Sequence, residues 1–137
     1  MILIPAKAGL ANIISYKKGS IKMYKVTAAN EAVTYEPPGH YDVRCTNLHK
    51  PDAVNDGEIS LGLSHFLPGG GAEMAPAPVE MFYYIVEGEM TVTTGEDGKA
   101  HVLHAGDSIH MGKGCERESK NTGITTAQML VCLVMKK

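Results

Sequence analysis

The sequence predicts an all-β protein with one domain, and three observations support this fold class. Fifteen glycines and seven prolines are spread over the 137 residues without a long amphipathic run between them, which favours short strands joined by turns. Segments rich in β-branched and aromatic residues alternate with turn signals such as Asp97-Gly98. The chain has the length of one ordinary domain, and a chain of this mass buries about two-thirds of its surface on folding. A core therefore needs no disulfide or metal ion.

The expected strands follow from the alternation of side chains and from the turns between them. They cover residues 41–49, 59–67, 81–94, 99–112 and 125–135, with a Gly- and Pro-rich loop over residues 68–78. Gly88 predicts a bend inside the third strand. One face of the second strand is rich in leucine and consists of Leu61, Leu63, His65 and Leu67. We expect this leucine-rich face to be the buried one.

The first forty residues are expected to form an N-terminal arm or an edge strand, and residues 41–137 to form the folded domain. The segment mixes a short apolar patch with a basic one. An apolar arm on a small β domain often packs on a second copy of the chain and covers an exposed sheet edge, so we expect a homodimer. A frayed chain end is the alternative.

Composition argues against several classes of function. Thirteen Lys and Arg against fifteen Asp and Glu give a net charge of −2, without a basic block that would follow a phosphate backbone, so no nucleic-acid partner is expected. No apolar run approaches the ~18 residues of a membrane span. The apolar start lacks a basic leading segment and is interrupted by Pro5, unlike a signal peptide. Three cysteines without a CxxC pair indicate a reducing compartment. We therefore expect a soluble, cytoplasmic protein.

Residues 58–135 resemble a cupin in the order and spacing of their parts. These parts are the PGGG loop, the strand FYYIVEGEMTV, the Asp-Gly hairpin and the segment HAGDSIHMGKG. The resemblance implies a cupin double-stranded β-helix, a jelly-roll barrel with an open mouth, preceded here by the N-terminal arm. The combination of a PGGG loop with a first motif that lacks histidine is similar to the metal-free half of ureidoglycine aminohydrolase-like two-domain cupins. Because this chain has one barrel, the similarity does not bring that activity with it.

The two cupin motifs locate the positions that hold a metal ion in the family. The first motif, G-x5-H-x-H-x(3,4)-E-x6-G, ends on Gly88 and places its histidines and glutamate at Ala75, Ala77 and Met81. A longer spacer places the histidines at Met74 and Pro76. The second motif, G-x5-P-x-G-x2-H-x3-N, matches Gly106, Gly114 and Asn121, with Gly112 in place of its proline and Arg117 in place of its histidine.

This departure from the family pattern predicts that the usual metal site is lost and that no cofactor is bound. Alanine and proline offer no donor atom, and the fixed positive charge of Arg117 repels a cation. Two alternatives remain open. Met74 or Met81 would suit soft copper(I). A displaced site would use His49, His65 and His110 with a glutamate, although no close spacing supports it.

Arg117 is the most informative candidate residue, because an inward guanidinium needs an anionic ligand or an acidic neighbour. The functional interpretation is a bidentate grip on a substrate carboxylate or phosphate. The structural alternative is an internal ion pair with Glu73, Glu80 or Glu118. A slip of one residue in this turn would instead turn Arg117 to the solvent.

Tyr83 and His65 are the candidates for acid or base. Tyr83 faces inward with Ile85 by alternation, and its alternative role is a packing residue. His65 is the one polar group on the leucine-rich face, and its alternative role is a hydrogen-bonded core histidine.

Three further residues are candidate ligand-binding groups. His49 would stand opposite His65 if their strands are neighbours, and His110 competes with Ile109 for the inward position. Glu80 is one residue away from the family's glutamate and faces the wrong way unless a bulge restores it.

The predicted function is the binding of a small anionic or polyhydroxylated molecule in the barrel. The first hypothesis is a metal-independent isomerase, epimerase or lyase that uses His65 or Tyr83 for proton transfer and Arg117 to hold the anion. The second is a non-catalytic binding or sensor protein, which needs a shaped pocket but no positioned base. The third is a metal-dependent cupin enzyme with displaced ligands.

Overall fold

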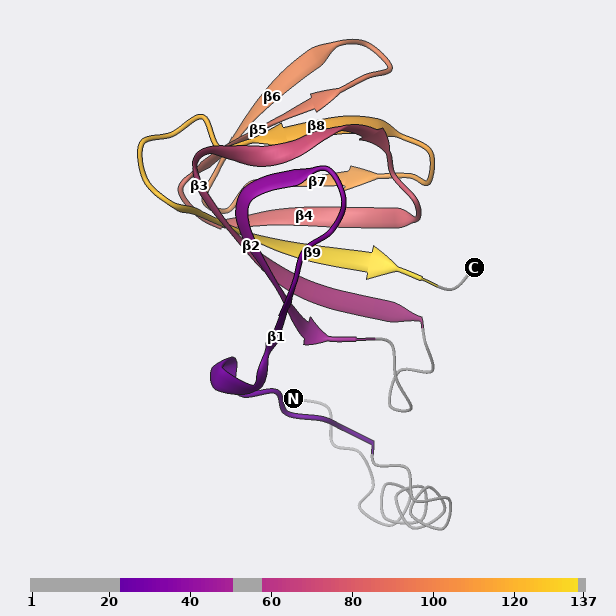
Figure 1. The fold of residues 1–137 in the computed structure, drawn as a ribbon. Helices are drawn as coiled ribbons and strands as arrows, with labels where there is room; N and C mark the ends of the chain where they lie inside the picture. The colour runs from indigo at the N-terminus through magenta and orange to yellow at the C-terminus, as the bar shows by residue number, and fades with distance from the viewer. Residues whose placement is uncertain (1–22, 51–57, 136–137) are drawn as a thin grey trace, which may run out of the picture.

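The computed structural model describes residues 23–50 and 58–135, which form an antiparallel β structure (Figure 1). A three-residue 3-10 turn is the one helical element among them, and none of the described helices is long and apolar enough to cross a membrane. The elements in chain order are η1 Ala29–Glu31, β1 Val33–Tyr35, β2 His40–His49, β3 Ile59–Pro76, β4 Glu80–Glu87, β5 Glu89–Thr94, β6 Lys99–His104, β7 Ser108–Met111, β8 Glu116–Lys120 and β9 Ala127–Val134. This agrees with the all-β class that the sequence predicts.

The strands form two layers that share β3. The strand order is β6-β5-β8-β3-β9-β4-β7, and β2 pairs along the remaining edge of β3. Residues 59–66 of β3 pair with β9 in one layer, whereas residues 71–76 pair with β8 in the other. Figure 1 shows β3 running from the lower layer, with β9 and β4, into the upper layer, with β8, β5 and β6. The result is the barrel-like, nearly closed sheet of a jelly roll.

The PGGG segment belongs to β3, so the predicted loop over residues 68–78 is wrong. The glycines allow the strand to cross between the layers at close range. A Cβ atom at Gly70 would collide with the carbonyl oxygen of Asp42 on β2, and one at Gly71 with that of Ser119 on β8. Gly69 has a φ of 84°, in the left-handed region that glycine adopts without strain. Glycine here permits close strand contact rather than ending the strand.

Other strand boundaries depart less from the expectation. The predicted strand over residues 81–94 is divided at Gly88, whose φ is 85°, into β4 and β5, which confirms the bend. The segment 99–112 is likewise divided into β6 and β7 by a turn. Strand β8 was not expected from the sequence, because its five residues, ERESK, are polar and carry no β-branched side chain.

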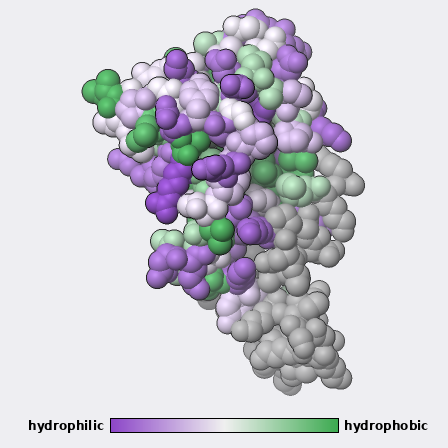
Figure 2. All heavy atoms as spheres, in the orientation of Figure 1, coloured by the Kyte–Doolittle hydropathy of each residue, from purple (hydrophilic) through white to green (hydrophobic). Residues whose placement is uncertain are grey.

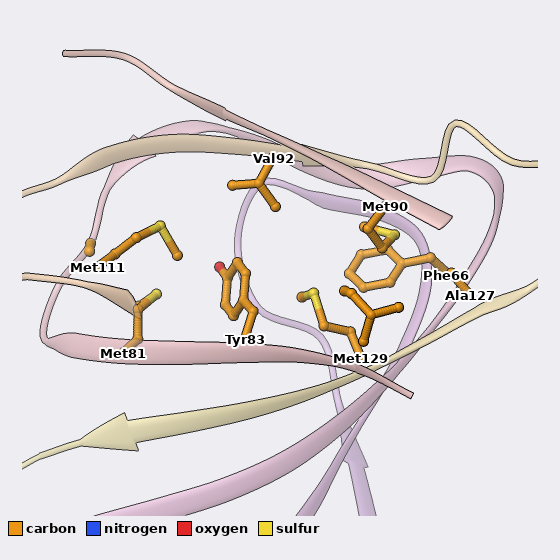
Figure 3. Packing of buried hydrophobic residues seen from close by; sticks show 10 residues of the cluster. Phe66, Met81, Tyr83, Met90, Val92, Met111, Ala127 and Met129 are labelled. Carbon is orange, nitrogen blue, oxygen red and sulfur yellow. The ribbon is translucent and has the colours of Figure 1, made fainter. Parts of the chain in front are cut away.

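The hydrophobic core lies between the two layers and is rich in methionine. Its buried members are Phe66, Ala77, Met81, Tyr83, Ile85, Met90, Val92, Met111, Ala127 and Met129. Figure 3 shows these side chains pointing from both layers into the interior. Burial of about ten such side chains contributes most of the stability of a domain of this size.

The leucine-rich face of β3 is not the buried one, which corrects the prediction. Ser60, Ser64 and Phe66 are buried inside, whereas Leu67 is 55% exposed. Leu61, Leu63 and His65 are partly buried on the outer face. The chain's outer surface is thus not uniformly polar. Figure 2 shows small hydrophobic groups between hydrophilic residues on the face that it draws.

Part of the expected arm or edge strand over residues 1–40 is described. Val33–Tyr35 form the edge strand β1, which pairs with Cys45–Asn47 of β2. Residues 1–22, where the apolar arm is predicted, lie outside the described residues.

Candidate functional site

A cavity of about 490 Å³ lies between the two layers. Its wall is formed by side chains from β1, β2, β3, β4, β8 and β9 and by the segment 37–39. Most of the wall is apolar, as in small-molecule sites generally, and a few polar groups converge on it. These polar groups are the hydroxyls of Tyr35, Ser64, Tyr83 and Ser119, the Cys45 thiol, the Arg117 guanidinium, and His40 and Glu73.

Arg117 lies on β8 between β3 and β5, in register with Ala75 on one side and Thr94 on the other. Its Nη1 donates a hydrogen bond of 2.8 Å to the Ala75 carbonyl oxygen. Its Nε is buried and has no hydrogen-bond partner within the described part of the chain. The inward position agrees with the expectation from the second cupin motif. The alternative in which a slip turns this side chain to the solvent is therefore wrong.

The predicted internal ion pair of Arg117 is not formed with the described residues. No carboxylate of residues 23–50 or 58–135 lies within ion-pair distance of the guanidinium. Of the three predicted partners, Glu80 bonds to His110 instead, at 2.7 Å. Glu73 lines the cavity as an exposed residue. The Arg117 guanidinium thus lines the cavity without direct ion-pair contact to a carboxylate of the described residues, although Glu73 belongs to the same lining.

Ser119 follows two residues after Arg117 and faces the same side of β8. Its side chain is 1% exposed, and its Oγ has no hydrogen-bond partner among the described residues. A buried hydroxyl without a partner is uncommon, because its desolvation is not compensated. Arg117 and Ser119 therefore form a stretch of cavity wall with unused donors.

Tyr83, Tyr35 and Cys45 bring ionisable groups to the opposite side of the cavity. Figure 3 shows the Tyr83 side chain standing up from β4 with its hydroxyl in the interior. Burial raises the pKa of Tyr35, and the neighbouring Cys45 and Tyr83 groups raise it further. Burial also raises the pKa of the Cys45 thiol, partly offset by a 3.5 Å hydrogen bond from the Ser64 hydroxyl. Tyr35 and Cys45 are therefore protonated near neutral pH and present donors to a ligand.

Sequence reasoning missed several of these cavity residues, and for different reasons. Ser64 and Phe66 lie on the face of β3 opposite the leucine-rich one, and the sequence predicts that the leucine-rich face is the inner one. Tyr35 belongs to a segment whose course the sequence did not indicate. Ser119 has one usable signal, its spacing of two residues from Arg117, which places both side chains on one face.

Two of the predicted site histidines lie away from the cavity. His65 is on the outer face of β3, between Arg44 and Gln128, and its buried Nδ1 has no partner among the described residues. His49 pairs with Leu61 rather than with His65, although β2 and β3 are neighbours. Neither histidine lines the cavity, so the expected opposition of the two is wrong.

His110 and Glu80 form a pair on the outer surface. Ile109 takes the inward position on β7 and packs against the core, whereas His110 is exposed. The His110 ring stacks on Phe82, with ring centroids 4.5 Å apart, and bonds to the Glu80 carboxylate. No bulge turns Glu80 inward, as β4 pairs in regular register from Glu80 to Ile85. These two side chains stabilise each other outside the barrel.

The fold defines a class of protein, and comparison with known proteins identifies the same class. A model of the cupin domain matches residues 62–133, and the chain therefore belongs to the cupin family. The chain is 37% identical over 107 residues to a protein of Mycobacterium tuberculosis named beta-D-galactosidase Rv1717, across 78% of this chain and 90% of that protein.

Solved structures of the same fold share less sequence. The polyketide cyclase RemF from Streptomyces resistomycificus has a TM-score of 0.70 at 17% identity, covering 82% of this chain and 80% of its own. An RmlC-like cupin from Shewanella frigidimarina has a TM-score of 0.65 at 17% identity, covering 83% and 93%. These two similarities concern the fold alone.

The residues at the family's metal-binding positions do not suit a divalent ion. Ala75 and Arg117, two of the positions that the motif alignment assigns to the metal site, are neighbours across β3 and β8. Ala77 and Met81 are both buried at 2% exposure and supply a methyl group and a thioether. A guanidinium beside these side chains provides no lone pair and repels a cation. Within residues 23–50 and 58–135, no three His, Cys, Asp or Glu side chains gather elsewhere as a possible metal site.

Proposed function

We propose that the protein binds a small polyhydroxylated molecule, a sugar or a glycoside, in the barrel cavity. The observation that carries this proposal is the cavity wall itself. Hydroxyl groups and the Arg117 guanidinium, whose buried Nε has no hydrogen-bond partner among the described residues, surround an otherwise apolar space. Polar groups that are buried without a partner are expensive, so a ligand that supplies acceptors is favoured.

The size and chemistry of the cavity support a ligand of this class. Its volume lies within the range of about 300–1,000 Å³ that small-molecule sites occupy. Sugar hydroxyls both donate and accept hydrogen bonds, which matches the Tyr35, Ser64 and Tyr83 hydroxyls. The apolar C–H face of a sugar ring suits the side chains of Met81 and Met129 on the same wall. The name of the 37% identical relative supports a β-galactoside as the first compound to test.

A second candidate is catalysis on that sugar, which the relative's name favours. Most glycosidases use a pair of carboxylates, and among the described residues the cavity lining has one, Glu73. Tyr83 is the inward group that would transfer a proton in hydrolysis, isomerisation or elimination, with Arg117 as the electrostatic partner. The predicted role of His65 as acid or base requires a ligand on the outer face of β3 and is not part of this candidate.

The test is calorimetric titration with D-galactose and methyl β-D-galactoside, together with a release assay on 4-nitrophenyl β-D-galactoside. Saturable binding that Tyr83→Phe weakens by about three- to tenfold, the effect of one hydrogen bond, would support the cavity as the site. Chelator-treated protein should bind equally well. Arg44→Met, on the exposed outer side of β2, is the control. Failure of these compounds and of a wider sugar panel to bind would refute the proposal.

Turnover separates the two candidates. Nitrophenol release that Tyr83→Phe abolishes, while binding is largely kept, would support an enzyme. Binding without release would support a sensor or carrier.

We also propose that the chain acts as a homodimer in the cytoplasm. The exposed outer residues of β4, Phe82, Tyr84 and Val86, form an apolar row suited to a second copy. All three cysteines are free in the structure, which suits a reducing compartment.

A further inference from the structure

We infer that the sugar carries a carboxylate, and that Arg117 and Ser119 form the subsite that holds it. This inference rests on the proposed function and names the class of sugar, a uronic acid or its glycoside. It follows from the donors that remain unused on one face of β8.

The first argument is that one edge of the Arg117 guanidinium has no hydrogen-bond partner among the described residues. Nη1 is occupied by the Ala75 carbonyl oxygen, at 2.8 Å. The Nε and Nη2 groups form the opposite edge, and neither has a hydrogen-bond partner among the described residues. The N–H bonds of this edge are parallel, which is the geometry that binds both oxygens of a carboxylate. The peptide bond to which Nη1 is tied fixes the orientation of the edge.

The second argument is the buried hydroxyl of Ser119, which lies two residues after Arg117 on the same strand. Ser119 is 1% exposed and is one of the residues that line the cavity. Its unpaired Oγ lies on the same strand face as Arg117, at a spacing of about 6.6 Å between Cα atoms. The long arginine side chain spans such a distance, so one anion on this wall receives donors from both residues.

The third argument is charge. Arg117 is the one fixed cation, and Glu73 the one carboxylate, among the described residues that line the cavity. Because Glu73 offsets the charge of Arg117 in this lining, a bound carboxylate adds one uncompensated negative charge, whereas a phosphate group adds about 1.5 to 2 at neutral pH. The wall therefore favours a carboxylate over a phosphate.

The experiment compares D-galacturonate with its methyl ester, with D-galactose and with D-galactose 6-phosphate, by calorimetric titration of the full chain. The ester keeps the shape of the acid and removes its charge. We expect the acid to bind at least about tenfold more tightly than the ester, because charge-assisted hydrogen bonds are strong. Arg117→Gln should abolish this preference, and Arg117→Lys should restore part of it. Ser119→Ala should weaken binding of the acid by several fold.

The controls separate this inference from the proposed function and from misfolding. Arg44→Gln removes the same charge from the outside of the barrel, since Arg44 is the other arginine of the chain, and should leave the preference unchanged. The melting temperature of each variant reports its folding. Equal binding of acid, ester and galactose would overturn the carboxylate subsite and leave the sugar site standing. Tightest binding of the phosphate would also overturn it. If no sugar binds, the proposed function is refuted, and the carboxylate subsite is refuted with it.

Discussion

In the first half of strand β3 the small residues face the interior and the leucines face outward, whereas an ordinary amphipathic strand buries its apolar face. Ser60, Gly62 and Ser64 face the interior, whereas Leu61 and Leu63 face outward. Of these small inner residues, Ser64 lines the cavity and contributes a polar group to it. A small polar residue at Ser64 therefore leaves room for the cavity, whereas the next inner residue, Phe66, packs in the core and borders the cavity.

The inner and outer faces of strand β4, unlike those of β3, are both apolar. Its inner residues are Met81, Tyr83 and Ile85, all buried, and its outer residues Phe82 and Tyr84 are 43% and 46% exposed. Both faces are apolar, so hydrophobicity does not distinguish them. Alternation establishes which residues share a face, but only the partner layer determines which face is inside.

The sharpest test of this comparison is a pair of truncations at adjacent positions of β3. Phe66 is 1% exposed inside and Leu67 is 55% exposed outside. We expect Phe66→Ala to lower the free energy of unfolding by about 3–5 kcal/mol, because it leaves a cavity in the core. Leu67→Ala should change it by about 0.5 kcal/mol or less. Urea unfolding monitored by circular dichroism measures both. Similar losses at the two positions would show that the leucine-rich face is buried after all.

The parts of the molecule that the sequence predicted well are those with local signals. Gly88 marked the bend between β4 and β5, and the spacing from Gly88 placed Tyr83 and Ile85 inside. The second cupin motif placed Arg117 at the wall of the barrel. Each of these predictions depends on residues close in sequence or on a motif with fixed spacing.

The parts that the sequence did not predict depend on contacts between distant segments. The inner face of β3 is determined by β9 and β2, and alternation alone leaves two choices. Tyr35 reaches the cavity because β1 pairs with β2, a pairing for which residues 33–35 carry no signal. His49 lies opposite Leu61 because of an irregularity in register between Asn47 and His49. A shift of one residue is invisible in the sequence and changes every cross-strand neighbour.

The second prediction concerns the outer face of β4 and its proposed role in association. Tyr84→Glu places a charge in the apolar row and should convert a dimer into a monomer of 14.7 kDa, because a buried unpaired charge is costly. Val102→Glu, at an equally exposed outer position on β6, is the matched control and should remain dimeric. Light scattering after size-exclusion chromatography measures the mass. A wild-type protein that elutes as a monomer at micromolar concentration contradicts the proposed homodimer.

The smallest expected effect is on the pH dependence of the free energy of unfolding, and it arises from the Cys45 thiol on the inner face of β2. Burial raises the pKa of Cys45 above its ordinary value of 9.0, so the folded chain keeps a proton that the unfolded chain releases at alkaline pH. The unfolded state then binds fewer protons, and the free energy of unfolding falls as the pH rises above about 9. Below that pH the contribution of this thiol is constant. Cys45→Ala should reduce the alkaline slope without removing it, because Tyr35, whose pKa is also raised, contributes in the same direction. Urea unfolding at several pH values between about 8 and 10.5 gives the slope, with Cys132→Ala on β9 as the control. A slope that Cys45→Ala leaves unchanged would mean that the thiol is as well solvated in the folded chain as in the unfolded one, and the inner face of β2 would then be open to water.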